Sequence, residues 1–299
     1  MDISVIIPQI LKINGSTAIQ QLIEETNNEI LSDKSIVEFD FTNTRFIAGE
    51  MTVLLGMLLK EIQRSNKTYK LNNMPDNISN ALTRNNFLPY FQGGMALSDI
   101  YNNTIQFYCG DARDDNKLNE YLNKQVFGNT HWFDVTSGQQ EKENISSAIH
   151  ELAINVHEHS TVNEVLCCGQ YYPNIHRLSF SLADNGISIP TSVHKHYPTI
   201  YNTDSGLINW ATQRGNSVKA SPASGLGLFS VKDKLTSSGG LTIISRYGYW
   251  QKSPDYVNEP LTFDLSESPL KGTFIHFSID MNDKINIEEN QDILKSIIF

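Results

Sequence analysis

Two side chains that could do chemistry lie four residues apart between Ser147 and Ser160. They are the carboxylate of Glu151 and the carboxamide of Asn155. On a helix, residues at this spacing lie on one face. A glutamate can take a proton from a water or a hydroxyl group, and an asparagine oxygen can ligate a hard cation such as Mg²⁺. The pair therefore indicates a metal-assisted site, and the alternative is an amphipathic helix with a polar outer face.

The residues around this pair predict the helix that would position it. Apolar side chains recur with helical spacing at Ile145, Ala148, Ile149, Leu152, Ala153 and Val156. A stripe of this kind faces a core. Glu151 and Asn155 fall at its border, where a helix can pack against a core and still present polar atoms to a pocket.

A second candidate segment is the run Leu178–Leu182, which is followed by Asp184 and Gly186. Large apolar residues alternate with small ones in the run, and this predicts a strand that leads into a turn. An aspartate at the end of such a strand can accept a hydrogen bond from an exocyclic amine.

A third candidate segment, Ser221–Leu235, is a glycine-rich turn that opens into an apolar-periodic helix. Glycines such as Gly225 and Gly227 let backbone N–H groups approach phosphate oxygens closely. The N-terminus of the helix that follows also favours an anion. The segment therefore indicates a phosphate-binding turn.

In this order and spacing, the segments resemble the motifs of the GHKL ATPase family, which has the Bergerat nucleotide-binding fold. The resemblance covers about residues 135–280. The matching residues are Glu151 and Asn155 for the N box, Asp184 and Gly186 for the first glycine box, Gly225, Leu226, Gly227 and Leu228 for the second, and Gly272 with Thr273 before the strand Phe274–Ile279.

The resemblance implies that the chain binds ATP together with Mg²⁺. Glu151 would then be the general base and Asn155 the Mg²⁺ ligand. The other implied roles are adenine recognition at Asp184, Gly186 and Thr273, and phosphate binding along Gly225, Leu226, Gly227 and Leu228.

Two further expectations concern the segment between the glycine boxes. Ser188 stands where the family often has a second glycine, and its Cβ is expected to restrict the turn beneath adenine. Pro190–Ser224 is rich in polar and turn-forming residues, with one predicted helix near Leu207–Thr212. It occupies the position of the family's ATP lid, and the cations expected to reach phosphate are Arg214, Lys219 and Lys232.

The N-terminal region alternates strand and helix patterns, which predicts an α/β layer. The patterns predict strands at Ile3–Ile7, Ile36–Phe41 and Lys67–Leu71 and helices at Ser16–Leu31 and Met51–Ile62. The passage Phe39–Gly56 resembles STAS domains, the fold of anti-sigma-factor antagonists. Antagonists commonly carry a phosphorylatable serine where Ala48, Gly49 and Glu50 stand here, so the resemblance implies an interaction module without that switch.

Composition argues against several other classes of protein. The net charge of −10 argues against a nucleic-acid-binding surface. Three cysteines make no disulfide framework, no apolar run reaches transmembrane length, and the N-terminus lacks the basic start of a signal peptide. These features favour a cytoplasmic protein with no membrane partner.

The sequence thus predicts an α/β (α+β) protein in two parts: a STAS-like domain with a connecting segment over residues 1–118, and a GHKL domain with a Bergerat α/β sandwich over residues 119–299. The expected function is ATP-dependent regulation, in which lid closure over Mg·ATP, with or without slow hydrolysis, controls a protein contact or self-association. The alternatives are a serine/threonine kinase of the anti-sigma-factor type acting on a STAS-domain partner, and a nucleotide-binding module that scarcely turns over.

Overall fold

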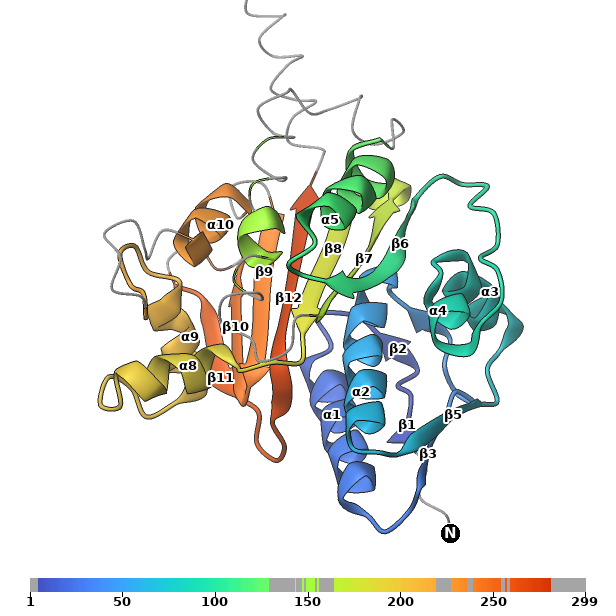
Figure 1. Ribbon diagram of the computed structural model, residues 1–299, viewed down its shortest axis with the longest axis horizontal. Helices are drawn as coiled ribbons and strands as arrows, with labels where there is room; N and C mark the ends of the chain where they lie inside the picture. Colours follow the sequence, from blue (N-terminus) through green and yellow to red (C-terminus); the bar gives the residue numbers. More distant parts are fainter. Residues whose placement is uncertain are drawn as a thin grey trace, which may run out of the picture.

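The computed structural model describes residues 5–128, 143, 147, 149–153, 155, 164–218, 227–235, 239–253, 256 and 259–280. This part of the chain is a mixed α/β protein, as expected, and is built around one large sheet (Figure 1). In the described residues, no helix has both the length and the apolar character needed to cross a bilayer.

The large sheet has seven strands in the order β11-β10-β9-β12-β8-β7-β6, and every neighbouring pair is antiparallel. The predicted strands at Leu178–Leu182 and Phe274–Ile279 both belong to it. Its members are β6 (Thr104–Asp111), β7 (Glu164–Tyr172), β8 (Arg177–Asp184), β9 (Gly239–Arg246), β10 (Gly248–Lys252), β11 (Leu261–Asp264) and β12 (Leu270–Asp280).

The N-terminal unit contains a smaller parallel sheet in the order β1-β3-β5, so its predicted strand–helix alternation is confirmed. The predicted helix Ser16–Leu31 has those bounds in the structure. The elements are β1 (Val5–Ile6), β2 (Ile10–Leu11), α1 (Ser16–Leu31), β3 (Ile36–Asp40), β4 (Phe46–Ile47), a 3₁₀ turn (Gly49–Met51), α2 (Thr52–Arg64), β5 (Thr68–Asn72), α3 (Asp76–Arg84) and α4 (Phe87–Gln92).

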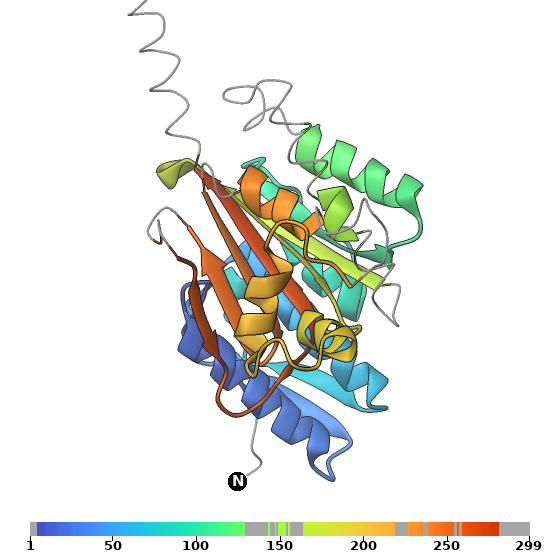
Figure 2. The same cartoon turned by 90° about the vertical axis from the view of Figure 1, so that its left-hand side faces the viewer.

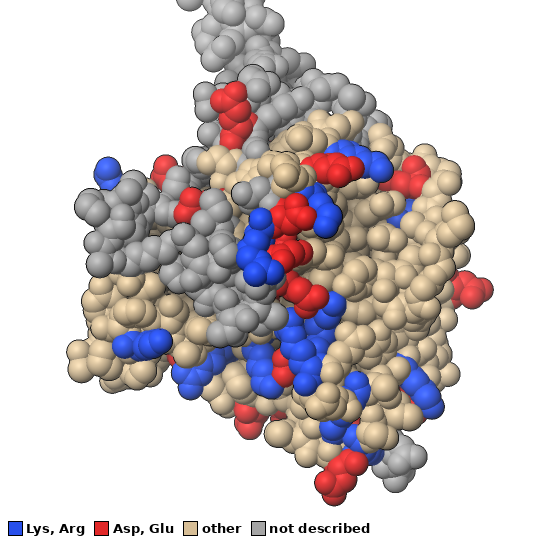
Figure 3. Space-filling model, viewed as in Figure 1, with Lys and Arg blue, Asp and Glu red and all other residues tan. Residues whose placement is uncertain are grey.

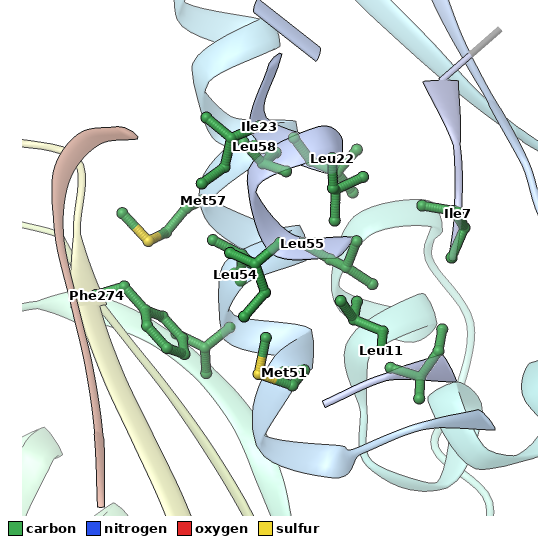
Figure 4. Packing of buried hydrophobic residues seen from close by; sticks show 14 of the residues in the cluster. Ile7, Leu11, Leu22, Ile23, Met51, Leu54, Leu55, Met57, Leu58 and Phe274 are labelled. Atoms are coloured by element: carbon green, nitrogen blue, oxygen red, sulfur yellow. The ribbon is translucent and has the colours of Figure 1, made fainter. Parts of the chain in front are cut away.

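Helix α2 joins this unit to the large sheet. Ten of its thirteen residues are buried, because β5 and α1 pack against one side and β7, β8 and β12 against the other. A Cβ at Gly56 would lie 2.9 Å from the Phe107 ring and 3.0 Å from Leu166, so glycine permits the close approach of helix and sheet. Figure 4 shows Phe274 of β12 pointing toward Met51, Leu54 and Met57 in this contact.

Both faces of the large sheet are buried, and alternate residues of each strand enter two different cores. Leu166, Ala183 and Phe274 belong to the core shared with the N-terminal unit. Val165, Leu182 and Ile275 belong to a second core on the opposite face. The sheet also extends across the division drawn at residues 118 and 119, because β6 precedes that point and pairs with β7.

The second core lies beneath a layer of helices (Figure 2). The helix predicted near Leu207–Thr212 is α9, and α8 is a helix that the sequence did not predict. The layer consists of α5 (Asp115–Tyr121), a π-helical turn (Leu122–Phe127), helical residues 149–153 and 155, α8 (Ile189–His196), α9 (Asp204–Ala211) and α10 (Gly227–Leu235).

Candidate functional site

The Glu151 and Asn155 pair lies on a helix, as predicted. Both side chains are half-buried, whereas Ile149, Leu152 and Ala153 are buried in the second core. For these residues the apolar stripe and its polar border are confirmed. The other predicted members of the stripe, Ile145, Ala148 and Val156, lie outside the described residues.

Asp184 is the last residue of β8, and its side chain is only 6% exposed. Its Oδ1 accepts a hydrogen bond of 2.7 Å from the backbone N–H of Gly186. The first glycine box thus folds back on itself, and the turn fixes the orientation of the carboxylate. A buried carboxylate held in this way can accept a further hydrogen bond from a ligand amine.

Thr273 of β12 lies directly opposite Asp184 in the register of the two strands. The hydroxyl groups of Thr273 and Ser245 are 2.9 Å apart, and Ser245 Oγ also donates to the carbonyl oxygen of Gly272 at 2.9 Å. Gly272 has φ +89, and a Cβ there would lie 1.9 Å from the Asp184 carbonyl oxygen. Only glycine therefore fits between these strand ends.

Strand alternation places the polar strand ends and the Glu151 helix on the same face of the sheet. Asp184 and Thr273 are each two residues from Leu182 and Ile275, and those two side chains enter the second core. The same core receives Ile149 and Leu152 from the helix. The sheet thus brings the first glycine box, Thr273 and the N box to one layer of the molecule.

The second glycine box is described only in part, because Gly225 and Leu226 lie outside the described residues. The predicted helix is present as α10, whose described residues start at Gly227, and the turn predicted before it lies outside the described residues. Leu228 packs against the second core, and Val231 is fully buried in it. The start of α10 is thereby held over the same sheet face as Asp184, beside the helical residues 149–153 in Figure 1.

Ser188 does not restrict the turn as the sequence led us to expect. Its φ of −66 and ψ of 153 are ordinary for a residue with a Cβ. Its hydroxyl caps α8 by accepting from the Thr191 N–H at 3.2 Å. Serine is among the favoured residues at an N-cap, so this position has a structural reason for not being glycine.

Much of the proposed lid segment is packed onto the sheet. The N–H groups of Asp204 and Ser205 donate to Asp264 of β11 at 3.0 and 2.8 Å, and Trp250 of β10 donates to Asn209 at 3.0 Å. These bonds fix α9 at the sheet edge. Two stretches of the described segment are exposed: residues 194–199 and 201–203 before α9, and residues 213–215 after it, which include Arg214.

The other two lid cations differ from Arg214. Lys219 lies outside the described residues. Lys232 is half-buried on α10, 5.1 Å above the Phe229 ring, and desolvation lowers the pKa of its ammonium group. Arg214 is therefore the exposed cation in the described part of this set.

Two residues near the first glycine box were missed in the sequence. Ser245 is a single serine in an apolar strand, and nothing local marks it as a partner of Thr273. Asn185 sits inside the Asp-x-Gly motif, is 8% exposed, and donates to the Met57 carbonyl oxygen of α2 at 2.9 Å. The motif thus contacts both layers: Asp184 faces the second core and Asn185 holds α2.

The STAS-like turn at Gly49 and Glu50 faces the large sheet. Glu50 is 4% exposed, and its Oε2 accepts a hydrogen bond of 2.7 Å from the Tyr172 hydroxyl group. Burial raises the pKa of the Glu50 carboxyl. The position that carries the phosphorylatable serine in antagonist STAS domains is thus part of an intramolecular contact.

Comparison with protein-family models finds no match to the chain, and comparison with curated proteins finds none either. In the described residues, no three His, Cys, Asp or Glu side chains gather as a metal site. The cysteines Cys109, Cys167 and Cys168 are free.

Proposed function

We propose that the chain is an ATP-binding regulatory protein in which Mg·ATP binds over the second core of a Bergerat-type α/β sandwich. The observation that supports this most directly is the cluster of Asp184, Ser245 and Thr273 at adjoining strand ends. A buried, oriented carboxylate beside two hydroxyl groups has the acceptors that an exocyclic amine requires. The Glu151 helix and the start of α10 lie over the same face.

Each proposed residue has a role that suits its chemistry. Asn155 supplies a neutral oxygen for Mg²⁺, an ion that keeps several waters and takes few protein ligands. When bound, the cation would neutralise charge on the phosphates. Glu151 would accept the proton of an attacking water, and Gly225 and Gly227 would admit phosphate oxygens to backbone N–H groups.

The regulatory part of the proposal rests on the contact between Asn185 and Met57. A turn that closes on adenine at Asp184 also holds α2 through the next residue. In this proposal, ATP affects the N-terminal unit because the Asn185–Met57 contact differs between the ATP-bound and ATP-free states. In the proposal, lid closure after Thr212 accompanies this coupling and changes a surface that contacts a partner or a second copy.

Titration calorimetry with Mg·ATP tests the binding site. Asp184→Asn should weaken binding, because a charged acceptor becomes a weaker neutral one. Asp76→Asn is the matched control, since Asp76 is exposed at the start of α3 in the N-terminal unit. Equal ATP affinity in the wild type and Asp184→Asn would remove Asp184 from its role, and no binding by the wild type would remove the proposal.

Phosphate release separates the roles of the N-box residues. Glu151→Gln should retain ATP and lose about 10²–10⁴-fold in turnover, because an amide cannot accept the proton. Asn155→Ala should lose the part of the ATP affinity that depends on Mg²⁺. If the wild type hydrolyses ATP and Glu151→Gln does so at the same rate, another group is the base.

The second candidate is a serine/threonine kinase acting on a separate STAS-domain protein. The observation that favours this function is that the turn at Ala48, Gly49 and Glu50 has no serine to accept a phosphoryl group. Gly49 and Glu50 of this turn instead contact Tyr172. Transfer of radiolabel from γ-labelled ATP to a STAS-domain protein would support this kinase. Phosphate release without a partner would support the ATPase switch, and binding with neither would support a module that only senses ATP.

A further inference from the structure

A polar cavity of about 350 Å³ lies between the N-terminal unit and the large sheet, on the face opposite to the proposed nucleotide site. Its floor is formed by β8, β9, β10 and β12, and one wall comes from the N-terminal unit near Lys12, Phe46 and Glu50. We call this cavity the interface pocket. Its volume is in the range of small-molecule sites.

The floor is the continuation of the face that packs against α2. Along β12, Phe274 is in the shared core, and the next residues on this face are His276, Ser278 and Asp280. Along β8, Ala183 is in the core and is followed by Ser181 and Ser179. The face therefore changes from apolar to polar about halfway along the strands, where α2 no longer covers it.

Register brings these polar side chains together in rows across the sheet. Ser181 lies opposite His276, and His276 lies opposite Thr242 on its other side. Ser179 lies opposite Ser278 in the next row. Side chains directly opposite each other in antiparallel strands are about 4.5–5.5 Å apart at Cβ, so each row forms a continuous hydrogen-bonding surface.

Two polar atoms of the floor can form hydrogen bonds that no described protein group supplies. Ser179 and His276 line the pocket and are each 3% exposed. His276 Nδ1 lies 3.2 Å from Ser181 Oγ, but among the described residues no hydrogen bond reaches His276 Nε2 or Ser179 Oγ. Both residues line the pocket, so these two atoms are placed to hydrogen-bond a molecule held there.

The charged groups of the pocket leave no uncompensated charge on its floor. Arg177 and Asp280 form a two-point ion pair, with Nε–Oδ1 2.6 Å and Nη2–Oδ2 3.2 Å. Glu50 is bonded to Tyr172, and Lys12 is exposed. Desolvation and the charge of Arg177 lower the pKa of His276 to about 3, so its imidazole is neutral. A charged ligand would find no free counter-ion on the floor, and the cation at the wall, Lys12, is exposed to solvent, which weakens its attraction for an anion.

We propose that the interface pocket binds a small, uncharged polyhydroxylated compound of the size of a monosaccharide or a cyclic polyol. Hydroxyl groups both donate and accept, and they complement a floor of serine hydroxyls and a neutral imidazole. The apolar edge of the pocket, Phe46 and Ile175, is 44% and 55% exposed and offers a surface for the C–H groups of such a ring. This site is independent of the proposed ATP site.

Saturation-transfer NMR on the full chain tests the proposal with glucose, ribose and myo-inositol as neutral probes and glutamate and citrate as charged ones. At least one neutral probe should receive saturation, and both charged probes should not. Ser179→Ala and Ser278→Ala should each weaken the best probe about fivefold or more in Kd, because each removes a hydroxyl partner. Ser98→Ala, at an exposed loop position, should leave the Kd unchanged.

Circular dichroism of each variant checks that the fold is retained, and having two serine variants protects the test against the misfolding of one. The proposal is overturned if none of the three neutral probes binds, or if binding is the same in Ser179→Ala, Ser278→Ala and the wild type. Binding of glutamate or citrate that depends on these serines would also overturn it, since the pocket would then accept an anion.

Discussion

The two faces of the large sheet carry polar groups in different ways. On the face of the second core, the polar groups Asp184, Ser245 and Thr273 lie at strand ends, beside turns. On the opposite face, Ser179, Ser181 and His276 lie within the strands. A strand-end group belongs to a local motif with glycines nearby, whereas a mid-strand group acquires its neighbours only through pairing. Asp184 and Thr273 could be found in the sequence through the glycines beside them, whereas Ser245 and the mid-strand groups could not.

The face of the molecule drawn in Figure 3 carries both signs of charge rather than a basic patch. In the view of Figure 3, basic and acidic side chains lie next to one another along the middle of the molecule. Several charged side chains of the protein form ion pairs, such as Lys60 and Arg64 with Glu164, and Lys271 with Glu61. Mixed charge of this kind, with a net charge of −10, does not attract a polyanion.

The largest expected effect tests whether the two cores form one folding unit. Phe274→Ala empties the core shared with the N-terminal unit, and Phe277→Ala empties the second core. Both rings are fully buried, so each change should cost about 3–5 kcal/mol of unfolding free energy. Denaturant unfolding should show one transition in both variants. Two separated transitions in Phe274→Ala would mean that the N-terminal unit folds on its own.

The next effect concerns Gly272, the glycine at the strand ends beside Asp184. Gly272 and Gly215 have similar backbone angles, φ +89 and +84, but a Cβ at Gly215 meets nothing within 4 Å. Gly215→Ala should cost about 1 kcal/mol, from backbone strain alone. Gly272→Ala should cost about 3 kcal/mol, because its Cβ also collides with Asp184 and Asn185. Equal unfolding free energies for the two variants would show that the strand ends can separate.

A smaller effect is the loss of unfolding free energy at acidic pH that is caused by His276, on the face of the sheet that lines the interface pocket. His276 has a pKa of about 3 in the folded protein and about 6.5 when unfolded. Its contribution is therefore fully present above pH 6.5 and is lost as the pH falls toward 3, by up to about 1.4 kcal/mol per pH unit. Between pH 7 and 5.5, the wild type should lose about 1 kcal/mol more than His276→Asn in unfolding free energy. Parallel curves for the two proteins would show that His276 is not shielded from water.

The smallest effect is a change in cleavage rate at the exposed end of the proposed lid. Trypsin should cut after Arg214 in the apo and ADP states and several-fold more slowly with a nonhydrolysable ATP analogue, if closure uses contacts with the γ-phosphate. Cleavage after Arg45, exposed in the N-terminal unit, is the internal control. Cutting at equal rates in all three states, with analogue binding shown separately, would make this segment an ordinary loop.

Local periodicity was enough to predict several elements. The stripe in Ser16–Leu31 gave a helix with the observed bounds, and the alternation in Leu178–Leu182 gave a strand of the large sheet. Helix α8 was missed because Pro190 is its second residue and because turn-forming residues follow the helix. Proline at the first helical positions is compatible with a helix, and Ser188 caps it.

The sequence by itself determined the parts of this protein that depend on short spacing: the helix that carries Glu151 and Asn155, the turn at Asp184 and Gly186, and the helix α10. These follow from backbone geometry and helical or strand period within about fifteen residues. The tertiary structure alone decided which face of the sheet each element covers, that α2 is buried between two sheets, and that an interface pocket exists. Ser181 and His276 are 95 residues apart and meet only because β12 lies between β8 and β9. Strand order is set by the joint burial of both faces, which no local pattern encodes.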